Sequence, residues 1–418
     1  MTNRIWKFLT SLRLTVTLLA LGIVLVFIGT VAQADEGLYV AQERYFKQWF
    51  VFGISLFGYK VPMPFPGGYL IGTLLLASLT AAFIHRFQWT WKKVGIHLTH
   101  VGIIMLLAGQ LVTDLLSRET QMRIHEGETI NYSESGSEYE LTIVAEVDAE
   151  TNEVVSIPQD LLVKRGELKH EKLPFTVRVK DYAPNTNPSF RAPMQQNGPP
   201  VTTNGLATSF DFNPIKTTHD MNSKNVPSVT VELAGANGSL GTWVVPGWAG
   251  DSGMADGLVR FFAREMGPQM ASTIRARLLT PQVVQAGGKG YTLTLRPTRA
   301  YKPFAFTLLK ATHSVYPGTE IPKDFRSRIL IENPSRGEKR ETEIYMNNPL
   351  RYGGLTFFQF QMSADEMVVR SGDTPSSTLQ VVRNPGWLTP YAGCVIVAAG
   401  MIFQFMFHLT KFLKRRTA

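Results

Sequence analysis

Two histidines, His97 and His100, lie in an apolar run, residues 94–113, that contains no Asp, Glu, Lys or Arg. At about 1.5 Å of rise per residue, a helix of this length crosses the roughly 30 Å hydrocarbon core of a bilayer. Residues three apart share one face of a helix, so both imidazoles can face the same groove. A polar ring in the membrane costs free energy unless it meets a partner, a cavity or a ligand. The pair is therefore the first candidate for a functional site.

Axial ligation of haem iron is a chemistry that suits an imidazole in this position, because iron takes a nitrogen ligand and the macrocycle requires apolar surroundings. Arg86, Lys92 and Lys93 precede the run, where they could meet the two propionate groups. The alternative is that either ring bonds a carbonyl or another polar group on a neighbouring helix. Helical periodicity alone leaves both interpretations open.

Three further uncharged runs have the same character and complete a set of four predicted membrane helices. These helices are expected at residues 14–33, 67–85, 94–113 and 387–408. The first run is too long for the apolar part of a signal peptide and lacks a good cleavage site, so we expect an uncleaved anchor.

The distribution of Lys and Arg around these runs predicts their orientation. Basic residues precede the first span, lie between the second and third, and follow the fourth, and such residues favour the cytoplasmic side. We therefore expect a multi-pass protein of the cytoplasmic (inner) membrane with both termini inside. The predicted cytoplasmic segments are residues 1–13, 86–93 and 409–418, and the predicted extracytoplasmic segments are residues 34–66 and 114–386.

Composition excludes several classes of function. The formal net charge of +9 is largely due to residues that flank the spans, so it does not indicate a nucleic-acid partner. The single cysteine, Cys394, lies in the fourth predicted span, which leaves the chain without a dithiol couple. GxSxG, HExxH, CxxC and Gly-rich phosphate-loop motifs are absent from the sequence. We therefore predict no catalytic residues.

Residues 114–386 are long enough for a core of their own and read mainly as β-structure, because short alternating runs recur between Gly and Pro. Residues 257–278 have helical spacing, and residues 184–204 are predicted to form a loop. The predicted fold is an integral membrane α-helical protein with four transmembrane helices and a large, mainly β extracytoplasmic domain between helices 3 and 4. The predicted strands include residues 140–147, 175–179, 228–233, 291–295 and 328–331.

Several short motifs follow one another along the chain. The first predicted span ends in Gly29-Thr30-Val31-Ala32-Gln33, the third contains Leu98-Thr99-His100-Val101-Gly102, and residues 122–128 end in Glu-Gly-Glu. Later motifs lie at residues 316–319, 322–327, 346–350, 352–354, 358–359 and 384–387. In order and spacing, these motifs resemble the ResB family, also called CcsB, a membrane subunit of the System II machinery for cytochrome c biogenesis.

This resemblance implies a partner-dependent function. A ResB-type protein acts with CcsA to carry haem across the membrane and present it for thioether attachment to apocytochrome c, as a non-catalytic or co-catalytic subunit of a holocytochrome c synthase. Because this chain has no tryptophan-rich loop, CcsA is expected to be a separate protein. The family's membrane histidine corresponds to His100, the expected metal ligand, with the second axial ligand supplied by the partner. His97 has no counterpart in the family pattern, so which of the two rings binds the cofactor stays open.

Two alternatives remain. The protein could be a structural assembly factor that docks apocytochrome or a thioredoxin-like thiol reductase and binds no haem, with both histidines in helix packing. A transporter or sensor fits the span layout but not the late motifs. In the ResB-type interpretation, the outer domain holds the partner and the apocytochrome, and Asn347, Asn348, Pro349 and Gln359 shape a turn near the membrane. The Asn-Pro sequence also forms turns for local backbone reasons alone.

Overall fold

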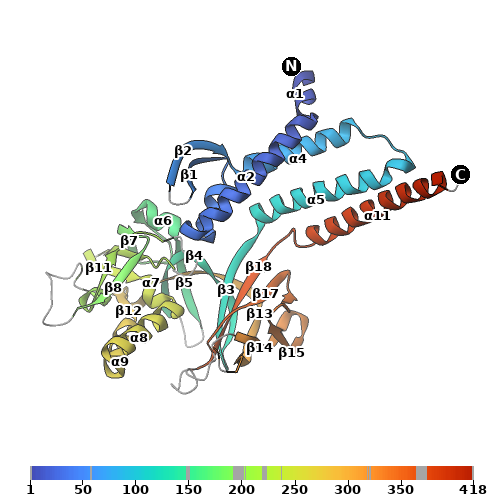
Figure 1. The fold of residues 1–418 in the computed structure, drawn as a ribbon. Helices are drawn as coiled ribbons and strands as arrows, with labels where there is room; N and C mark the ends of the chain where they lie inside the picture. The colour runs from blue at the N-terminus through green and yellow to red at the C-terminus, as the bar shows by residue number, and fades with distance from the viewer. Residues whose placement is uncertain are drawn as a thin grey trace. The chain divides into compact units, whose positions relative to one another are not determined.

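The computed structural model describes residues 2–416 except 57–58, 147–150, 192–201, 203, 219–223, 237, 318, 320–321 and 364–373. The chain divides into two compact units, which we call the helical unit and the sheet unit. The helical unit consists mainly of Met1–Arg118 and Val382–Ala418, and the sheet unit contains most of the residues between them. Figure 1 shows the elements of each unit.

Within its described residues, the helical unit contains four helices that are long and apolar enough to cross a membrane, as predicted. They are α2 (Leu12–Glu36), α4 (Gly68–His85), α5 (Val94–Leu116) and α11 (Thr389–Arg416). The last of them follows the sheet unit in the sequence, and the side of the membrane on which each segment lies stays a prediction. Shorter elements are α1 (Thr2–Leu9), α3 (Leu38–Ala41), the π-helix η1 (Gln42–Phe46), the 3-10 helix η2 (Trp91–Lys93), and the hairpin of β1 (Phe50–Leu56) and β2 (Tyr59–Pro66).

Helices α5 and α11 lie side by side along their length (Figure 1). Glycines recur at every seventh residue on the contacting faces, and we call this contact the glycine seam; it comprises Gly95, Gly102 and Gly109 on α5 and Gly393 and Gly400 on α11. An ideal Cβ at position 95 would lie 2.6 Å from the Gly400 carbonyl oxygen. The two backbones are therefore in direct contact, as small residues permit in membrane helix pairs.

The sheet unit is mainly β-structure, as predicted. Its largest sheet has ten strands, in the order β15-β14-β13-β4-β3-β18-β17-β16, with β12 on β13 and β5 on β4. The strands are β3 (Arg118–His125), β4 (Thr129–Glu146), β5 (Asn152–Pro158), β12 (Gln282–Ala286), β13 (Lys289–Val315), β14 (Pro322–Asn333), β15 (Glu338–Tyr345), β16 (Leu350–Tyr352), β17 (Leu355–Ser363) and β18 (Ser376–Arg383).

Smaller elements complete this unit. A four-stranded sheet has the order β11-β10-β7-β6, and β8 pairs with β9. Helices α8 and α9 confirm the helical prediction for residues 257–278. Each predicted strand lies within an observed strand, except that the last residue of the strand predicted at residues 140–147 is outside the described residues. The elements are β6 (Gly166–Leu168), β7 (Phe175–Ala183), β8 (Thr186–Phe190), β9 (Phe210–Pro214), β10 (Ser228–Gly235), β11 (Gly238–Pro246), α6 (Gln159–Lys164), α7 (Gly247–Gly250), α8 (Ser252–Met266), α9 (Pro268–Leu278), η3 (Gly205–Thr208) and η4 (Pro334–Arg336).

The loop predicted at residues 184–204 is wrong in part, because β8 lies within it. The backbone of β8 pairs with β9, and this long-range pairing overrides the local preference of Asn and Pro for turns. The rest of the predicted loop includes residues 192–201 and 203, which lie outside the described residues, as does Gly318 of the motif at residues 316–319.

Strand β13 contributes to two hydrophobic cores. Tyr291, Leu293 and Leu295 belong to one core, together with residues of β4, β7 and β10. Phe306 and Leu308 belong to the other, together with residues of β3, β14, β17 and β18. Between these stretches the pairing with β4 shifts in register, once between Pro297 and Arg299 and again between Tyr301 and Phe306.

Candidate cofactor-binding site on helix α5

The side chain of His100 has one ring nitrogen engaged and one available. Its Nδ1 atom lies 2.8 Å from the Ile96 carbonyl oxygen, one turn earlier in α5. A carbonyl oxygen only accepts hydrogen bonds, so Nδ1 carries the proton and donates. The Nε2 atom then holds a lone pair, which is the form in which an imidazole binds a metal. His100 is therefore in a tautomer that can bind a metal through Nε2.

The ring of His97 is arranged in the opposite way. Its Nε2 atom lies 2.9 Å from the Gln88 carbonyl oxygen, so Nε2 is the donor and Nδ1 holds the lone pair. Nδ1 is next to the Cβ attachment, where the backbone of α5 limits access to a bulky group. The two histidines that the sequence could not separate thus differ in which nitrogen can reach a ligand.

Phenylalanines of α4 and the following turn contact both histidines. The Phe83 ring stacks on the His100 ring with centroids 6.2 Å apart, and it meets the His97 ring edge-on at 5.7 Å. Phe87 lies 4.8 Å from the His97 ring. Such contacts restrict the ring planes of both histidines. Sequence reasoning missed both phenylalanines, because their contact with α5 depends on how the two helices pack.

The glycine seam and His100 lie on different sides of α5. Two residues correspond to about 200° around a helix, so His100 lies nearly opposite Gly102. The seam fixes α5 against α11, and the imidazole is presented on the face that contacts Phe83 of α4. The half-buried position of His100 leaves part of this face accessible.

Two of the three basic residues predicted to meet propionates, Arg86 and Lys93, form hydrogen bonds within this unit. Arg86 donates to the Thr10 carbonyl oxygen at 3.1 Å, and the Lys93 ammonium donates to the side-chain carbonyl of Gln88. Lys92 is exposed beside them. The other two histidines at helix ends are also bonded, His85 to Trp6 Nε1 at 3.3 Å and His408 to Gln404 Nε2 at 2.8 Å.

The described residues contain no group of three or more His, Cys, Asp or Glu that could hold a metal ion. A protein cage for a bare metal ion therefore has no support in this part of the chain. Haem has a different requirement, because its macrocycle supplies four nitrogens and the protein supplies only one or two axial ligands. The donor set at His100 fits that requirement.

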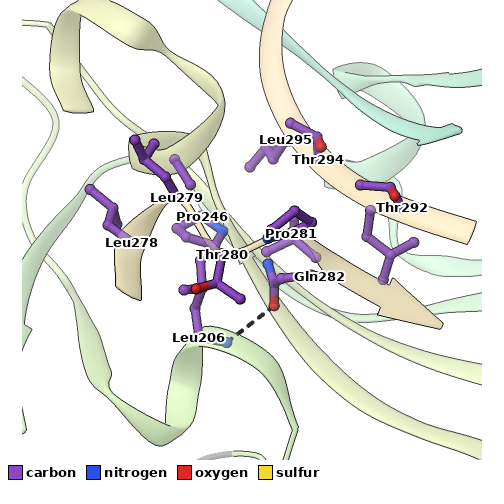
Figure 2. A pocket seen from close by; sticks show the side chains of 13 residues that line it. Leu206, Pro246, Leu278, Leu279, Thr280, Pro281, Gln282, Thr292, Thr294 and Leu295 are labelled. Carbon is purple, nitrogen blue, oxygen red and sulfur yellow. Dashed lines mark hydrogen bonds between the residues drawn. The ribbon is translucent and has the colours of Figure 1, made fainter. Parts of the chain in front are cut away.

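The sheet unit contains two cavities that are alternative candidate sites. Figure 2 shows one of about 170 Å³, lined mainly by apolar side chains, in which Gln282 Oε1 accepts a hydrogen bond from the Leu206 amide at 3.2 Å. The other, about 120 Å³, is lined by Arg299 and Glu134, which form an ion pair at 3.0 Å. Burial raises the pKa of Glu134, against the opposing effect of Arg299.

The predicted turn at Asn347 and Asn348 is present, but Gln359 is not part of it. Asn347 has a φ of 62°, and the Asn348 amide donates to the Tyr345 carbonyl oxygen at 3.0 Å. Gln359 lies on β17, where its side chain bonds Ser327 Oγ at 2.6 Å and Ser377 Oγ at 3.0 Å. Including Gln359 in the turn was wrong, because β17 directs it toward neighbouring strands.

Most of the strands that carry the motifs at residues 316–359 lie in a segment that is similar to known proteins. Residues 280–374 match the model of the ResB-like family. This part of the chain is ResB-like. The matched segment begins just before β12 and includes β17, so the resemblance expected from the late motifs is confirmed. Helix α5 and its histidines lie outside the ResB-like segment.

A curated relative, Protein NrfI of Wolinella succinogenes, is 28% identical to this chain over 120 residues. The match covers 29% of this chain and 12% of NrfI, so the chain spans only a small part of that relative.

Proposed function

We propose that this protein is a ResB/CcsB-type subunit of a System II cytochrome c synthase complex in the cytoplasmic membrane. In this role it acts with a CcsA-type protein to carry haem across the membrane and present it for thioether attachment to apocytochrome c. Support comes from the ResB-like segment at residues 280–374 and from the relationship to NrfI. The single observation that carries the haem-binding part is the orientation of His100, with Nδ1 bonded and Nε2 available.

The residues around His100 prepare it for this role. Donation from Nδ1 to the Ile96 carbonyl oxygen holds the tautomer and increases the basicity of Nε2. Phe83 limits rotation of the ring, and the glycine seam holds α5 in place on its other side. If bound, haem would supply an iron atom, and His100 would hold it through the lone pair on Nε2. The second axial nitrogen comes from the partner in this proposal.

Matched substitutions at the two histidines test this assignment. The chain is expressed with a CcsA-type partner, and haem in the purified complex is measured from its absorption spectrum. We expect His100→Ala to remove most of the haem and His97→Ala to retain it, because Nε2 of His97 is engaged by Gln88. Added imidazole should restore part of the haem in the His100→Ala complex, because it can occupy the emptied axial position.

The possible outcomes separate the alternatives. Loss of haem in His97→Ala alone would assign the ligand to the other ring. Full haem content in both variants, with impaired cytochrome maturation when the sheet unit is altered, would favour an assembly factor that docks apocytochrome or a thiol reductase. The observation that favours this assembly-factor function is that the family match lies within the sheet unit, not at the histidines.

The membrane orientation is proposed from charge and is testable separately. The last helix ends with Lys414, Arg415 and Arg416, which favours a cytoplasmic C-terminus. A fluorescent protein fused to the C-terminus should fluoresce, and alkaline phosphatase inserted between α5 and α11 should be active. The reverse pattern would show that the sheet unit faces the cytoplasm, which would contradict presentation of haem to an extracytoplasmic apocytochrome.

A further inference from the structure

A second accessible region of the helical unit lies at the other end of α5 from His100. It is a cavity of about 540 Å³ between the end of α2, η1, the start of α4 and the end of α5. This volume is within the range of small-molecule binding sites. Asp114, which lines it, is fourteen residues beyond His100, or about 21 Å along the helix axis. The cavity is therefore separate from the site proposed for haem.

Most of the cavity wall is apolar. Phe46, Leu76, Leu107 and Leu111 contribute hydrocarbon from three different elements. Gly72 adds no side chain, and an ideal Cβ at this position would meet no atom within 4 Å. The wall can therefore contact a hydrocarbon chain.

One end of the cavity is polar and carries both signs of charge. The Tyr69 hydroxyl donates a hydrogen bond to Asp114 Oδ2. Lys47 Nζ lies 4.0 Å from Asp114 Oδ1 and 2.6 Å from Glu43 Oε1. Lys47 and Asp114 line the cavity and carry opposite charges, whereas Glu43 binds Lys47 from outside the lining. A ligand with one positive and one negative group therefore complements this end of the cavity.

We propose that this cavity binds a phospholipid with a primary-ammonium headgroup, of the phosphatidylethanolamine class. The ammonium of the headgroup donates to Asp114, its phosphate pairs with Lys47, and an acyl chain lies along Leu107 and Leu111. Charge-assisted hydrogen bonds of this kind are shorter and stronger than neutral ones. An anionic headgroup without an ammonium has no cation to pair with Asp114, and a trimethylammonium headgroup has no N–H to donate.

Such a lipid would brace α4 against α5. Near His100 the two helices are in contact through Phe83, and at the other end, beside the cavity, the hydrogen bond from Tyr69 to Asp114 joins them. The surrounding bilayer supplies the ligand, so the proposal requires no additional protein. It also does not depend on haem binding, because its ligand and its residues differ from those at His100.

Native mass spectrometry of the full chain tests the proposal. The protein is reconstituted in nanodiscs of equal parts phosphatidylethanolamine, phosphatidylcholine and phosphatidylglycerol, and lipids that remain bound after release are identified by mass. We expect retention of phosphatidylethanolamine over the other two by about tenfold. Asp114→Asn should abolish this preference, because it removes the negative charge and keeps the shape of the side chain.

A pair of tryptophan substitutions on α5 provides the matched control. Leu111→Trp fills the cavity and should remove the retained lipid. Leu115→Trp places the same indole at an exposed position outside the cavity and should leave retention unchanged. Absence of retained lipid on the native chain, equal retention of all three headgroups, or retention in Leu111→Trp equal to that in Leu115→Trp would each overturn the proposal. The Asp114→Asn result decides the question if Leu111→Trp fails to fold.

Discussion

The Gly102→Ala substitution tests whether backbone contact between α5 and α11 stabilises the helical unit. An ideal Cβ at position 102 would lie 2.6 Å from Val397 Cγ2 and 3.0 Å from both Gly393 O and Val397 N. Carbon atoms normally pack at about 3.5–4.0 Å, and two of the three contacts are to backbone, so the helices must separate by up to about 1 Å. Overpacking of this kind costs about 1–3 kcal/mol.

Part of that cost is offset, because alanine is favoured over glycine within a helix by about 0.5–1 kcal/mol. We therefore expect a net loss of about 1–2 kcal/mol in the free energy of unfolding. The measurement is denaturation in mixed micelles with increasing SDS, followed by tryptophan fluorescence.

Gly22→Ala on α2 is the matched control for this experiment. An ideal Cβ at position 22 meets only Ile71 Cγ2, at 3.8 Å, which is an ordinary contact. This variant should be as stable as the native protein or slightly more stable. Equal stability of the Gly102→Ala and Gly22→Ala variants would refute the reasoning, because it would mean that the seam accommodates a methyl group without cost.

Three further predictions concern the sheet unit. Burial lowers the pKa of Lys302 to about 8 from an ordinary 10.5, so the unfolded state binds the extra proton between these pH values. The melting temperature should thus increase as the pH rises from about 8 to 10.5. A melting temperature that does not change over this range, or that rises equally in Lys302→Gln, would contradict a lowered pKa of Lys302. Asn347 has a positive φ, so Asn347→Ala should lower the free energy of unfolding by about 1 kcal/mol, whereas Asn347→Gly should leave it unchanged. Thermal unfolding of the two variants measures the difference. Asp251 is buried, accepts a hydrogen bond from the Met254 amide at 3.2 Å and forms an ion pair with Lys224 at 2.5 Å. Asp251→Ala should lower the free energy of unfolding in urea by about 3 kcal/mol, because it leaves Lys224 without this carboxylate. A decrease of less than about 1 kcal/mol would argue against a stabilising ion pair.

The sequence was sufficient for features that depend on local patterns. Four apolar runs predicted the four candidate membrane helices, and alternation predicted strands such as β7 and β10 because each has one face in a core. The glycine seam was missed, although its seven-residue spacing is visible at Gly95, Gly102 and Gly109. A search for small residues at helical repeats would have found it.

The candidate site was only partly predictable. The sequence identified His97 and His100 but could not rank them, because the difference lies in which carbonyl each ring nitrogen meets. The same limit applies to the lipid cavity. Its walls come from segments that are distant in the sequence, so no local pattern reveals that Lys47 and Asp114 lie at one end.

The continuity of β13 has a consequence for how the sheet unit opens. Its residues pass from the core containing Leu293 to the core containing Phe306 without leaving the strand. Both cores are joined by the backbone hydrogen bonds between β13 and β4. A transient local unfolding around one core therefore strains the hydrogen bonds of the other. Amide hydrogens at the two ends of β13 should then exchange with solvent at similar rates, as one cooperative foldon rather than two.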